Sequence, residues 1–355
     1  MKKIIFLLWF FTNFFSVKAQ QPLECGKYII DTAAETLANT YRAAHRDAAA
    51  VNTMIRVYFY IVADNDGSNV AATPAQVESE FNQLINDYAG NSLCFANMGF
   101  RYIYDTNINF NINCDNPASY SALNIWLVPN CITIFYQRRL LANGGGSYGG
   151  NAYAIPNTFC SVATGNINSG RTTSHEVGHC LGLLHTFEPN SGFENINGNN
   201  CSTTGDRVCD TPSDPWARGA CFSRSGCAYT GTCADGNSAT NFSPPYNNIM
   251  SYWFLGGCVP TNFSGGQFAR ANGFIGSNAG LISTVSAFNA VTGPTNYNST
   301  YGMLSAINAL STNGALVCTN NCVVGMAGRK VTLNPGFRAT PTTGRITVRG
   351  NICFY

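Results

Sequence analysis

The chain places three of its four histidines within eleven residues, His175 to His185, in the stretch TTSHEVGHCLGLLHTF at 172–187. On a helix, His175 and His179 lie one turn apart, so both imidazoles leave the same face and can bind one ion. Gly182 allows the helix to end in a left-handed turn, after which His185 can return towards that ion. Three neutral imidazoles with an open fourth position are the ligands of catalytic zinc. The stretch therefore predicts a zinc site formed by a helix and the turn that ends it.

Glu176 follows the first histidine and can reach a water on the ion without becoming a ligand. Zinc lowers the pKa of such a water to about 7, and Glu176 can take its proton as the water attacks a carbonyl carbon. An amphipathic helix with ordinary surface or core histidines is the alternative. The full spacing H-E-x-x-H-x-x-G-x-x-H is far more specific than an isolated HExxH, so we expect Glu176 to be a catalytic base.

The first residues, MKKIIFLLWFFTNFFSVKAQ, have the charged start, apolar stretch and small-residue cleavage site of a secretory signal. The apolar run is broken by Thr12 and Asn13 and is shorter than the ~20 residues that span a bilayer. Fifteen cysteines suit an oxidising compartment and predict disulfides, and the odd count leaves at least one thiol without an intramolecular partner. We expect a secreted, disulfide-bonded protein with no membrane span, and the net charge of +2 gives no case for nucleic-acid binding.

Strands and one helix are predicted before the histidine stretch. Residues 73–90 have Thr73 as N-cap, Pro74 in the first turn, Gln76 to close a capping box, and an apolar stripe that indicates a helix ending near Gly90. Apolar and β-branched runs predict the strands, at 54–63, 100–106 and 123–128. Residues 143–156 form a glycine-rich loop that leads into a short strand.

Composition divides the chain further. Beyond Cys201 it is rich in Gly, Asn, Ser, Thr, Pro and Cys, which predicts long loops with two or three disulfides among Cys201, Cys209, Cys221, Cys227, Cys233 and Cys258. After about residue 292, short alternating segments predict a small β-rich module. The expected divisions are a signal peptide (1–19), a pro-segment (20–51), a peptidase domain (52–291) and the C-terminal module (292–355).

Three motifs in order, HEVGHCLGLLHTF, GDRVCDTPSDP (205–215) and NNIMSYW (247–253), resemble the pappalysin family of metzincin metalloproteases over roughly residues 54–275. The resemblance implies an α+β zincin fold, with a twisted sheet over the active-site helix and a loop-rich lower part. It also implies a zinc endopeptidase that acts on proteins or peptides. In such proteins a tight turn places a methionine, here Met250, beneath the histidines, although Met250 alone could be ordinary core packing. The role that the resemblance gives Tyr252 is support of the oxyanion.

Further expectations follow from the resemblance. The family binds calcium in the region of GDRVCDTPSDP, so Asp206 and Thr211 are candidate calcium ligands, and a solvated turn is the alternative. Family proenzymes carry a Cys-Gly near the N-terminus, which makes Cys25 a candidate thiolate cap on the zinc, with an ordinary disulfide as the alternative. The signal and the abundant Asn suggest a Bacteroidetes-type member, and a monomer is expected. The alternative function is a binding or adhesion protein that keeps an inactive metzincin scaffold.

The subsite next to the scissile bond is expected to prefer apolar over basic side chains. No acidic residue follows Asp235, and the segment after Met250 reads SYWFLGGC. The preference would be different if Asp206, Asp210 or Asp214 reached the subsite.

Overall fold

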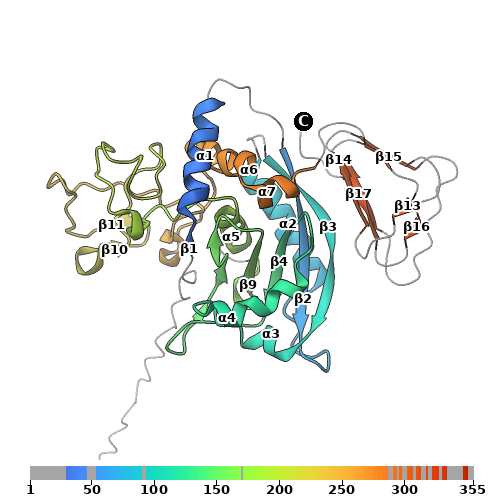
Figure 1. Ribbon diagram of the computed structural model, residues 1–355. Coiled ribbons are helices and arrows are strands. Elements are labelled where there is room, and N and C mark those ends of the chain that lie inside the picture. Colours follow the sequence, from blue (N-terminus) through green and yellow to red (C-terminus); the bar gives the residue numbers. More distant parts are fainter. Residues whose placement is uncertain are drawn as a thin grey trace, which may run out of the picture.

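A five-stranded twisted sheet forms the centre of the protein, as seen in a computed structural model (Figure 1). The structure describes residues 29–45, 53–89, 93–168 and 171–286, together with the backbone of eight short strands between 291 and 350. In the sheet the order is β3-β2-β4-β9-β7, and every neighbouring pair is parallel except β9 with β7. The strands are β2 (Thr53–Ala63), β3 (Leu93–Tyr104), β4 (Ile132–Gln137), β7 (Gly150–Asn151) and β9 (Phe159–Ala163).

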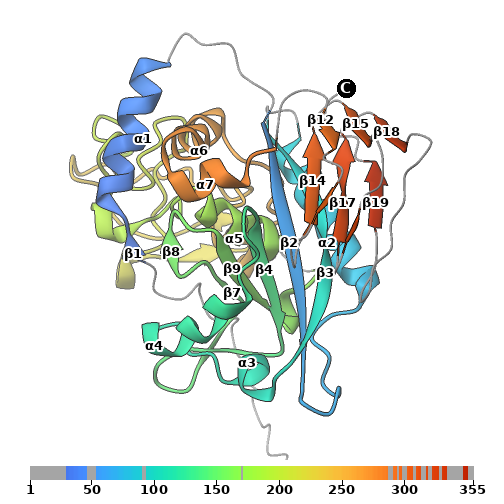
Figure 2. The ribbon, with the colours of Figure 1, turned by 45° about the vertical axis from the view of Figure 1, so that its right-hand side comes forward.

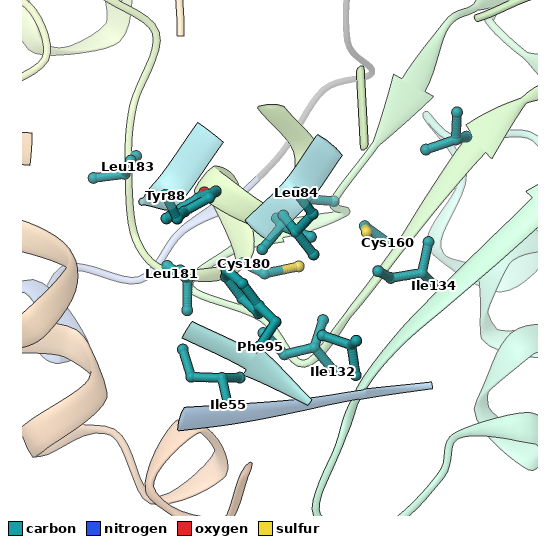
Figure 3. Close-up of a cluster of buried hydrophobic side chains, with 14 of the residues drawn as sticks. Ile55, Leu84, Tyr88, Phe95, Ile132, Ile134, Cys160, Cys180, Leu181 and Leu183 are labelled. Atoms are coloured by element: carbon teal, nitrogen blue, oxygen red, sulfur yellow. The ribbon is translucent and has the colours of Figure 1, made fainter. Parts of the chain in front are cut away.

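One face of the sheet is covered by α2 (Pro74–Tyr88) and α5 (Thr172–Cys180). Their apolar sides meet Ile55, Ile132 and other inward residues of the strands in one fully buried core, drawn in Figure 3. The predicted capping box of α2 is present, because Thr73 and Gln76 each accept from the other's backbone N–H. Val77, Phe81, Leu84 and Tyr88 are buried as the stripe predicted, and the helix ends at Tyr88; Gly90 lies outside the described residues.

The opposite face is covered by short helices. These are α3 (Thr106–Phe110), α4 (Pro117–Tyr120) and the 3-10 turn η1 (Ser121–Trp126), of which α3 and η1 supply Ile108 and Leu123 to a second buried core. The strand predicted at 123–128 is wrong, because η1 occupies most of that stretch. Ile125 is 84 % exposed while Leu123 is buried, so the short apolar run is a helical turn with one side in water.

Three further helices close the same side as α5. α6 (Gly265–Ser277) and α7 (Ala279–Thr284) follow the loop-rich part, and α1 (Thr32–Ala44) lies against α6 in both views (Figures 1 and 2). Sequence periodicity missed α1, whose buried side consists largely of alanines. Just before α1, β1 (Ile29–Ile30) pairs in parallel with β8 (Ala154–Ile155), which follows β7 in the chain.

Residues 187–262 form the lower part of the protein and contain little regular structure. The described elements there are three 3-10 turns and one two-stranded ribbon, namely η3 (Pro189–Ser191), η4 (Gly219–Cys221), η5 (Trp253–Gly256) and β10–β11 (Arg224–Ser225 with Ala228–Tyr229). Thus the α+β architecture, with a sheet above the helix α5 and loops below, is confirmed.

The C-terminal strands lie beside β3 and form small parallel sheets (Figure 2). Two of them coincide with predicted β segments, β18 (Lys330–Leu333) and β19 (Thr347–Gly350). The others are β12 (Val291–Gly293), β13 (Asn296–Tyr297), β14 (Gly302–Ala306), β15 (Ala309–Thr312), β16 (Val317–Cys318) and β17 (Cys322–Ala327). The signal peptide and Cys25 lie outside the described residues. In the described part of the chain, no helix has the length and apolar character that a bilayer crossing requires.

Candidate metal centre

The start of α5 is held by two carboxylates of α2. Arg171, at the N-cap, has a positive φ of 65° and offers no side-chain cap. Instead Glu80 accepts from the Thr173 hydroxyl and from the backbone N–H of Asn168, while Asp87 accepts from the Ser174 hydroxyl at 2.6 Å and pairs with Arg171. Burial raises the pKa of Glu80. Both carboxylates bind the first turn of α5, so they determine where the helix that carries His175 and His179 begins. Their burial could have been suspected from the sequence only weakly, because both carboxylates lie on the apolar, buried side of an amphipathic helix.

Two glycines inside α5 and its turn are required by close packing. A Cβ on Gly178 would lie 2.6 Å from Met250 Sδ, so the methionine packs directly on the helix backbone. Gly182 has φ +91°, and the Leu183 N–H donates to Gly178 O across the turn, as in a Schellman ending. A Cβ on Gly182 would collide with the Phe274 ring. The predicted left-handed turn is therefore present, and it leads the chain back to His185.

The three predicted ligands converge. The Nε2 atoms of His175 and His185 are 3.1 Å apart, as are those of His179 and His185, and all three residues are buried. One ring nitrogen from each lies within 4.8 Å of the others, the one such group of three metal-ligating side chains among the described residues. Ligands of a tetrahedral zinc with bonds of 2.0–2.1 Å are about 3.3 Å apart. The donor set and its spacing thus fit a zinc ion.

The outward ring nitrogens of two histidines are already fixed by backbone carbonyls. His175 Nδ1 donates to Ile249 O at 2.6 Å, and His179 Nδ1 donates to Leu183 O at 2.8 Å. These bonds orient Nε2 of both rings towards the centre. Burial lowers the pKa of His175 to about 4 and the pKa values of His179 and His185 well below 6.5. All three imidazoles are therefore neutral near pH 7, the form that binds a metal.

Glu176 and Tyr252 flank the histidines from opposite elements. Glu176 is fully buried and lies against β7, where a side chain at Gly150 would collide with the Glu176 carboxylate. The Tyr252 ring centroid lies 4.7 Å from that of His185 and 5.9 Å from that of His175. The Tyr252 ring thus packs against two of the imidazoles, and the carboxylate of Glu176, the residue after His175, lies against β7.

The turn at Met250 is tied both to α6 and to the loop 205–215. Asn248 accepts from the Met250 N–H at 2.9 Å and exchanges side-chain hydrogen bonds with Gln267 of the α6 capping box. Asp214 is buried and accepts from Thr186, Ser251, Trp216 and Trp253. It therefore links the residue after His185 to both neighbours of Tyr252, a role that sequence reasoning did not foresee.

The structure separates the three aspartates of the loop 205–215. Asp210 accepts from Ser264 and Gly266 at the start of α6, and Asp214 serves the turn just described. Asp206 is buried with Thr211, whose hydroxyl lies 2.9 Å from Asp206 Oδ1 and also contacts Val208 O. Glu194 Oε2 is buried nearby without a hydrogen-bond partner among the described residues. Burial raises the pKa of Asp206, with Glu194 repulsion adding to it, and raises the pKa of Glu194 to about 7.

Cysteines in the lower part form three bridges, as predicted for that region: Cys201–Cys209, Cys221–Cys233 and Cys227–Cys258. Four cysteines of the upper part are buried and lie outside the described disulfides, namely Cys114, Cys131, Cys160 and Cys180. The odd cysteine count therefore does not single out Cys25 as the unpaired thiol.

A cavity of about 820 Å³ opens between α2, the start of α5 and the segment after Tyr252. Phe254, Leu255 and Val259 line one wall, and Asn166 and Arg171 line another. The Glu80 carboxylate also borders the cavity, but its oxygens already accept from Thr173 and Asn168.

Known proteins that are similar to this chain are metalloproteases, in agreement with the geometry of the three histidines. Residues 146–275 match a peptidase family model described as pregnancy-associated plasma protein-A. An extracellular metalloprotease of Arthroderma benhamiae is 27% identical over 195 residues, which are 50% of this chain and 61% of that protein. One of Podospora anserina is 25% identical over 276 residues, covering 72% and 86% of the two chains, and one of Pyricularia oryzae is 25% identical, covering 57% and 70%. The chain thus spans about 61% of the length of the Arthroderma relative.

The relatives' extracellular naming and the three bridges agree with the predicted secretion. The matched stretch contains all three histidines, Met250 and Tyr252, and it sits on the α+β framework that the resemblance implied. Residues 146–275 are therefore similar to the peptidase family described as pregnancy-associated plasma protein-A, and the chain is similar to extracellular metalloproteases.

Proposed function

We propose that the protein is a secreted zinc-dependent endopeptidase that hydrolyses peptide bonds in proteins or peptides. The convergence of His175, His179 and His185 Nε2 atoms in a buried site carries this proposal. When bound there, zinc supplies Lewis acidity that lowers the pKa of a water and polarises a peptide carbonyl. His175, His179 and His185 would hold it.

The remaining chemistry belongs to the neighbouring side chains. Glu176, fully buried beside the histidines, would accept the proton of the attacking water and pass it to the leaving amine. Tyr252 would donate a hydrogen bond to the oxygen on which negative charge develops. The Met250 turn would support the histidines from below, since its Sδ packs against the α5 backbone.

Glu176→Ala tests this function. We expect the variant to bind zinc in a 1:1 ratio, as the unchanged protein does, and to lose on the order of 10²–10⁴-fold in kcat against a peptide library. The measurements are metal content and library hydrolysis, each with and without a chelator. The alternative, an inactive scaffold that serves binding or adhesion, requires that the unchanged protein bind zinc and hydrolyse nothing.

A specificity for apolar over basic residues after the scissile bond is part of the proposal. The aspartates that would have changed this expectation are engaged elsewhere, Asp206 with Thr211, Asp210 with Ser264, and Asp214 with the Met250 turn. The cavity beside α5 has an apolar wall and the guanidinium of Arg171. A cleavage profile dominated by arginine at that position would refute this specificity.

Calcium is proposed as a second, structural ion. Asp206, the Thr211 hydroxyl, Val208 O and Glu194 offer oxygen ligands on an irregular loop, which suits a hard cation. Two carboxylates of raised pKa in one buried place are the further support, because a cation would allow both to ionise. The solvated turn considered from sequence does not match the burial of Asp206.

We propose that Cys25 keeps the uncleaved protein inactive, and the direction of β1 supports this proposal. The strand runs parallel to β8, with Ile29 opposite Ala154. The described part of this segment begins four residues after Cys25, beside Ala154, and Gly150, four residues before Ala154, lies against Glu176. A thiolate arriving there could take the open position on zinc.

Cys25→Ala should then raise the rate of peptide hydrolysis by freshly purified, uncleaved protein by at least about tenfold. Its progress curve should show no lag. Cys131→Ala is the matched control, because that buried thiol lies in the other core. Equal activity of Cys25→Ala and the unchanged protein while residues 20–50 are still attached would exclude the thiolate cap.

The C-terminal strands carry no histidine or carboxylate and are proposed to be dispensable for the chemistry.

A further inference from the structure

Helix α1 lies within the predicted pro-segment, yet it packs into the peptidase part of the protein. Ala34 and Ala38 belong to the same buried core as α5 and the sheet. The side chain of Arg42 lies over α6, where a Cβ on Gly273 would come within 2.7 Å of Arg42 Cγ. In both ribbon views α1 lies beside α6 (Figures 1 and 2). The contact is thus built from matched small residues on both helices.

Glu35 forms a buried ion pair at the centre of this contact. Its two oxygens accept from Arg270 Nη1 at 2.6 Å and Nη2 at 2.5 Å, a bidentate arrangement. Arg270 is only 1% exposed, and Glu35 is the one carboxylate within ion-pair distance of it in the described ranges. Removal of α1 would leave a buried guanidinium without its counter-charge, which is strongly unfavourable.

Two more arginines surround the same carboxylate. Arg207, from the loop that holds Asp206, has Nη1 3.5 Å from Glu35 Oε2. The pKa of Arg42 is lowered by burial and by repulsion from Arg270, and Glu35 opposes that shift. Glu35 therefore faces three cations, from α1, α6 and the lower loop, and Arg270 is also attracted by the Asp206 carboxylate.

Arg270 connects this cluster to the metal motif. Its Nε donates to Gly182 O at 2.8 Å. Gly182 is the residue of positive φ at which the chain turns from His179 towards His185. Glu35 is therefore two hydrogen bonds away from the turn that brings the third imidazole to the centre.

We infer that residues 29–45 stay bound to the peptidase part of the active protein, and that Glu35 is a positioning residue for the metal site through Arg270 and Gly182. A maturation cut would then fall outside α1. Arg42 lies in the last turn of the helix, whereas a protease needs an extended chain, so a cut at Arg42 is incompatible with an intact α1. This inference goes beyond the proposed function, because the binding measurements below do not require proteolytic activity.

The test uses the full chain with the recognition sequence of a specific protease placed within residues 46–52. After cutting, gel filtration and mass spectrometry should find the fragment that contains residues 29–45 co-eluting with the remainder. In Glu35→Gln the fragment should separate, and the melting temperature should fall by roughly 10 °C. Leu37→Ala, on the exposed side of the same helix, should behave like the unchanged sequence.

The positioning role is tested by zinc affinity in uncut protein at a temperature where every variant is folded. Arg270→Lys keeps the charge but loses the bidentate pair and the Nε contact, so zinc should bind about tenfold more weakly. Adding a synthetic 29–45 peptide to the cut Glu35→Gln remainder should restore zinc affinity towards that of the uncut protein. Retention of residues 29–45 would be overturned if the cut protein of unchanged sequence lost this fragment and kept the melting temperature and zinc affinity of the uncut protein. Unaltered zinc binding in Arg270→Lys would overturn the positioning role, whatever the protein cleaves.

Discussion

The upper and lower parts of the protein are held together by different means. The upper part, the sheet with α2 and α5, buries two continuous apolar cores, and four of its cysteines lie inside them as thiols, while Cys94 of β3 is disulfide-bonded. The lower part, residues 187–262, has short 3-10 turns, three disulfides and buried carboxylates that bond to loop backbone and side chains. The metal centre lies where they meet: His175 and His179 come from α5, and His185 and Tyr252 belong to the turn and loop below. The candidate metal centre therefore depends both on the apolar cores of the upper part and on the disulfides and buried carboxylates of the lower part.

Leu84→Ala should have the largest effect on the upper part. Leu84 is fully buried in the core drawn in Figure 3, so truncation leaves a cavity and should reduce the free energy of unfolding by about 2–5 kcal/mol. Chemical denaturation followed by near-UV circular dichroism measures this. Leu37→Ala, 57% exposed on α1, is the control and should change stability by less than about 0.5 kcal/mol. Equal effects of the two would contradict an upper part stabilised by apolar packing.

Asp214→Asn should affect the junction of the two parts. The amide cannot accept all four hydrogen bonds that the carboxylate accepts, so stability should fall by about 1–3 kcal/mol. Because Asp214 holds the neighbours of Tyr252 and His185, kcat should fall by roughly 10- to 100-fold with a smaller change in KM.

Asp210→Asn is the matched control for Asp214. It belongs to the same loop but bonds to the start of α6, through Ser264 and Gly266. It should lower stability by at most about 1 kcal/mol and leave kcat within a factor of about two. A comparable loss of kcat in both variants would show that the loop acts as a whole rather than through Asp214.

The smallest expected effect concerns pH and calcium in the lower part. The folded-state pKa values of Asp206 and Glu194 are raised, the latter to about 7, so the folded protein keeps protons that the unfolded chain releases. Their contribution to stability is present below the unfolded pKa values and is lost as pH rises towards 7. Without calcium, the melting temperature should therefore fall between about pH 5 and pH 7.5.

Millimolar calcium should remove this fall, because the ionised carboxylates then face a cation. Dialysed, zinc-loaded protein scanned with and without added calcium provides the measurement. A melting temperature that rises with pH in the absence of calcium, or that ignores calcium at every pH, would rule out the calcium proposal.

Sequence reasoning predicted the local features that depend on neighbouring residues. The cap and stripe of α2, the histidine helix and the left-handed turn at Gly182 are all set by spacing within a few residues. The same approach misassigned 123–128, since a six-residue apolar run has no periodicity long enough to separate strand from helical turn. It missed α1, because alanine gives little apolar contrast.

Long-range partners were not predictable in this way. Asp206, Asp210 and Asp214 are equivalent in the printed sequence, and only the fold assigns them to Thr211, to α6 and to the Met250 turn. Glu35 and Arg270 are 235 positions apart, and no local pattern joins them. The candidate metal ligands could thus be inferred from the sequence, while the residues that orient them needed the structure.

The position of His185 beyond the end of α5 has a consequence for the order of assembly during export. A chain with only its upper part folded presents two imidazoles, and two nitrogen ligands retain zinc much less well than three. The third joins them only after the chain has turned at Gly182 and the loops below have closed around Asp214. We therefore expect metal capture to follow the closing of the turn and the lower loops, because the candidate site is incomplete without His185.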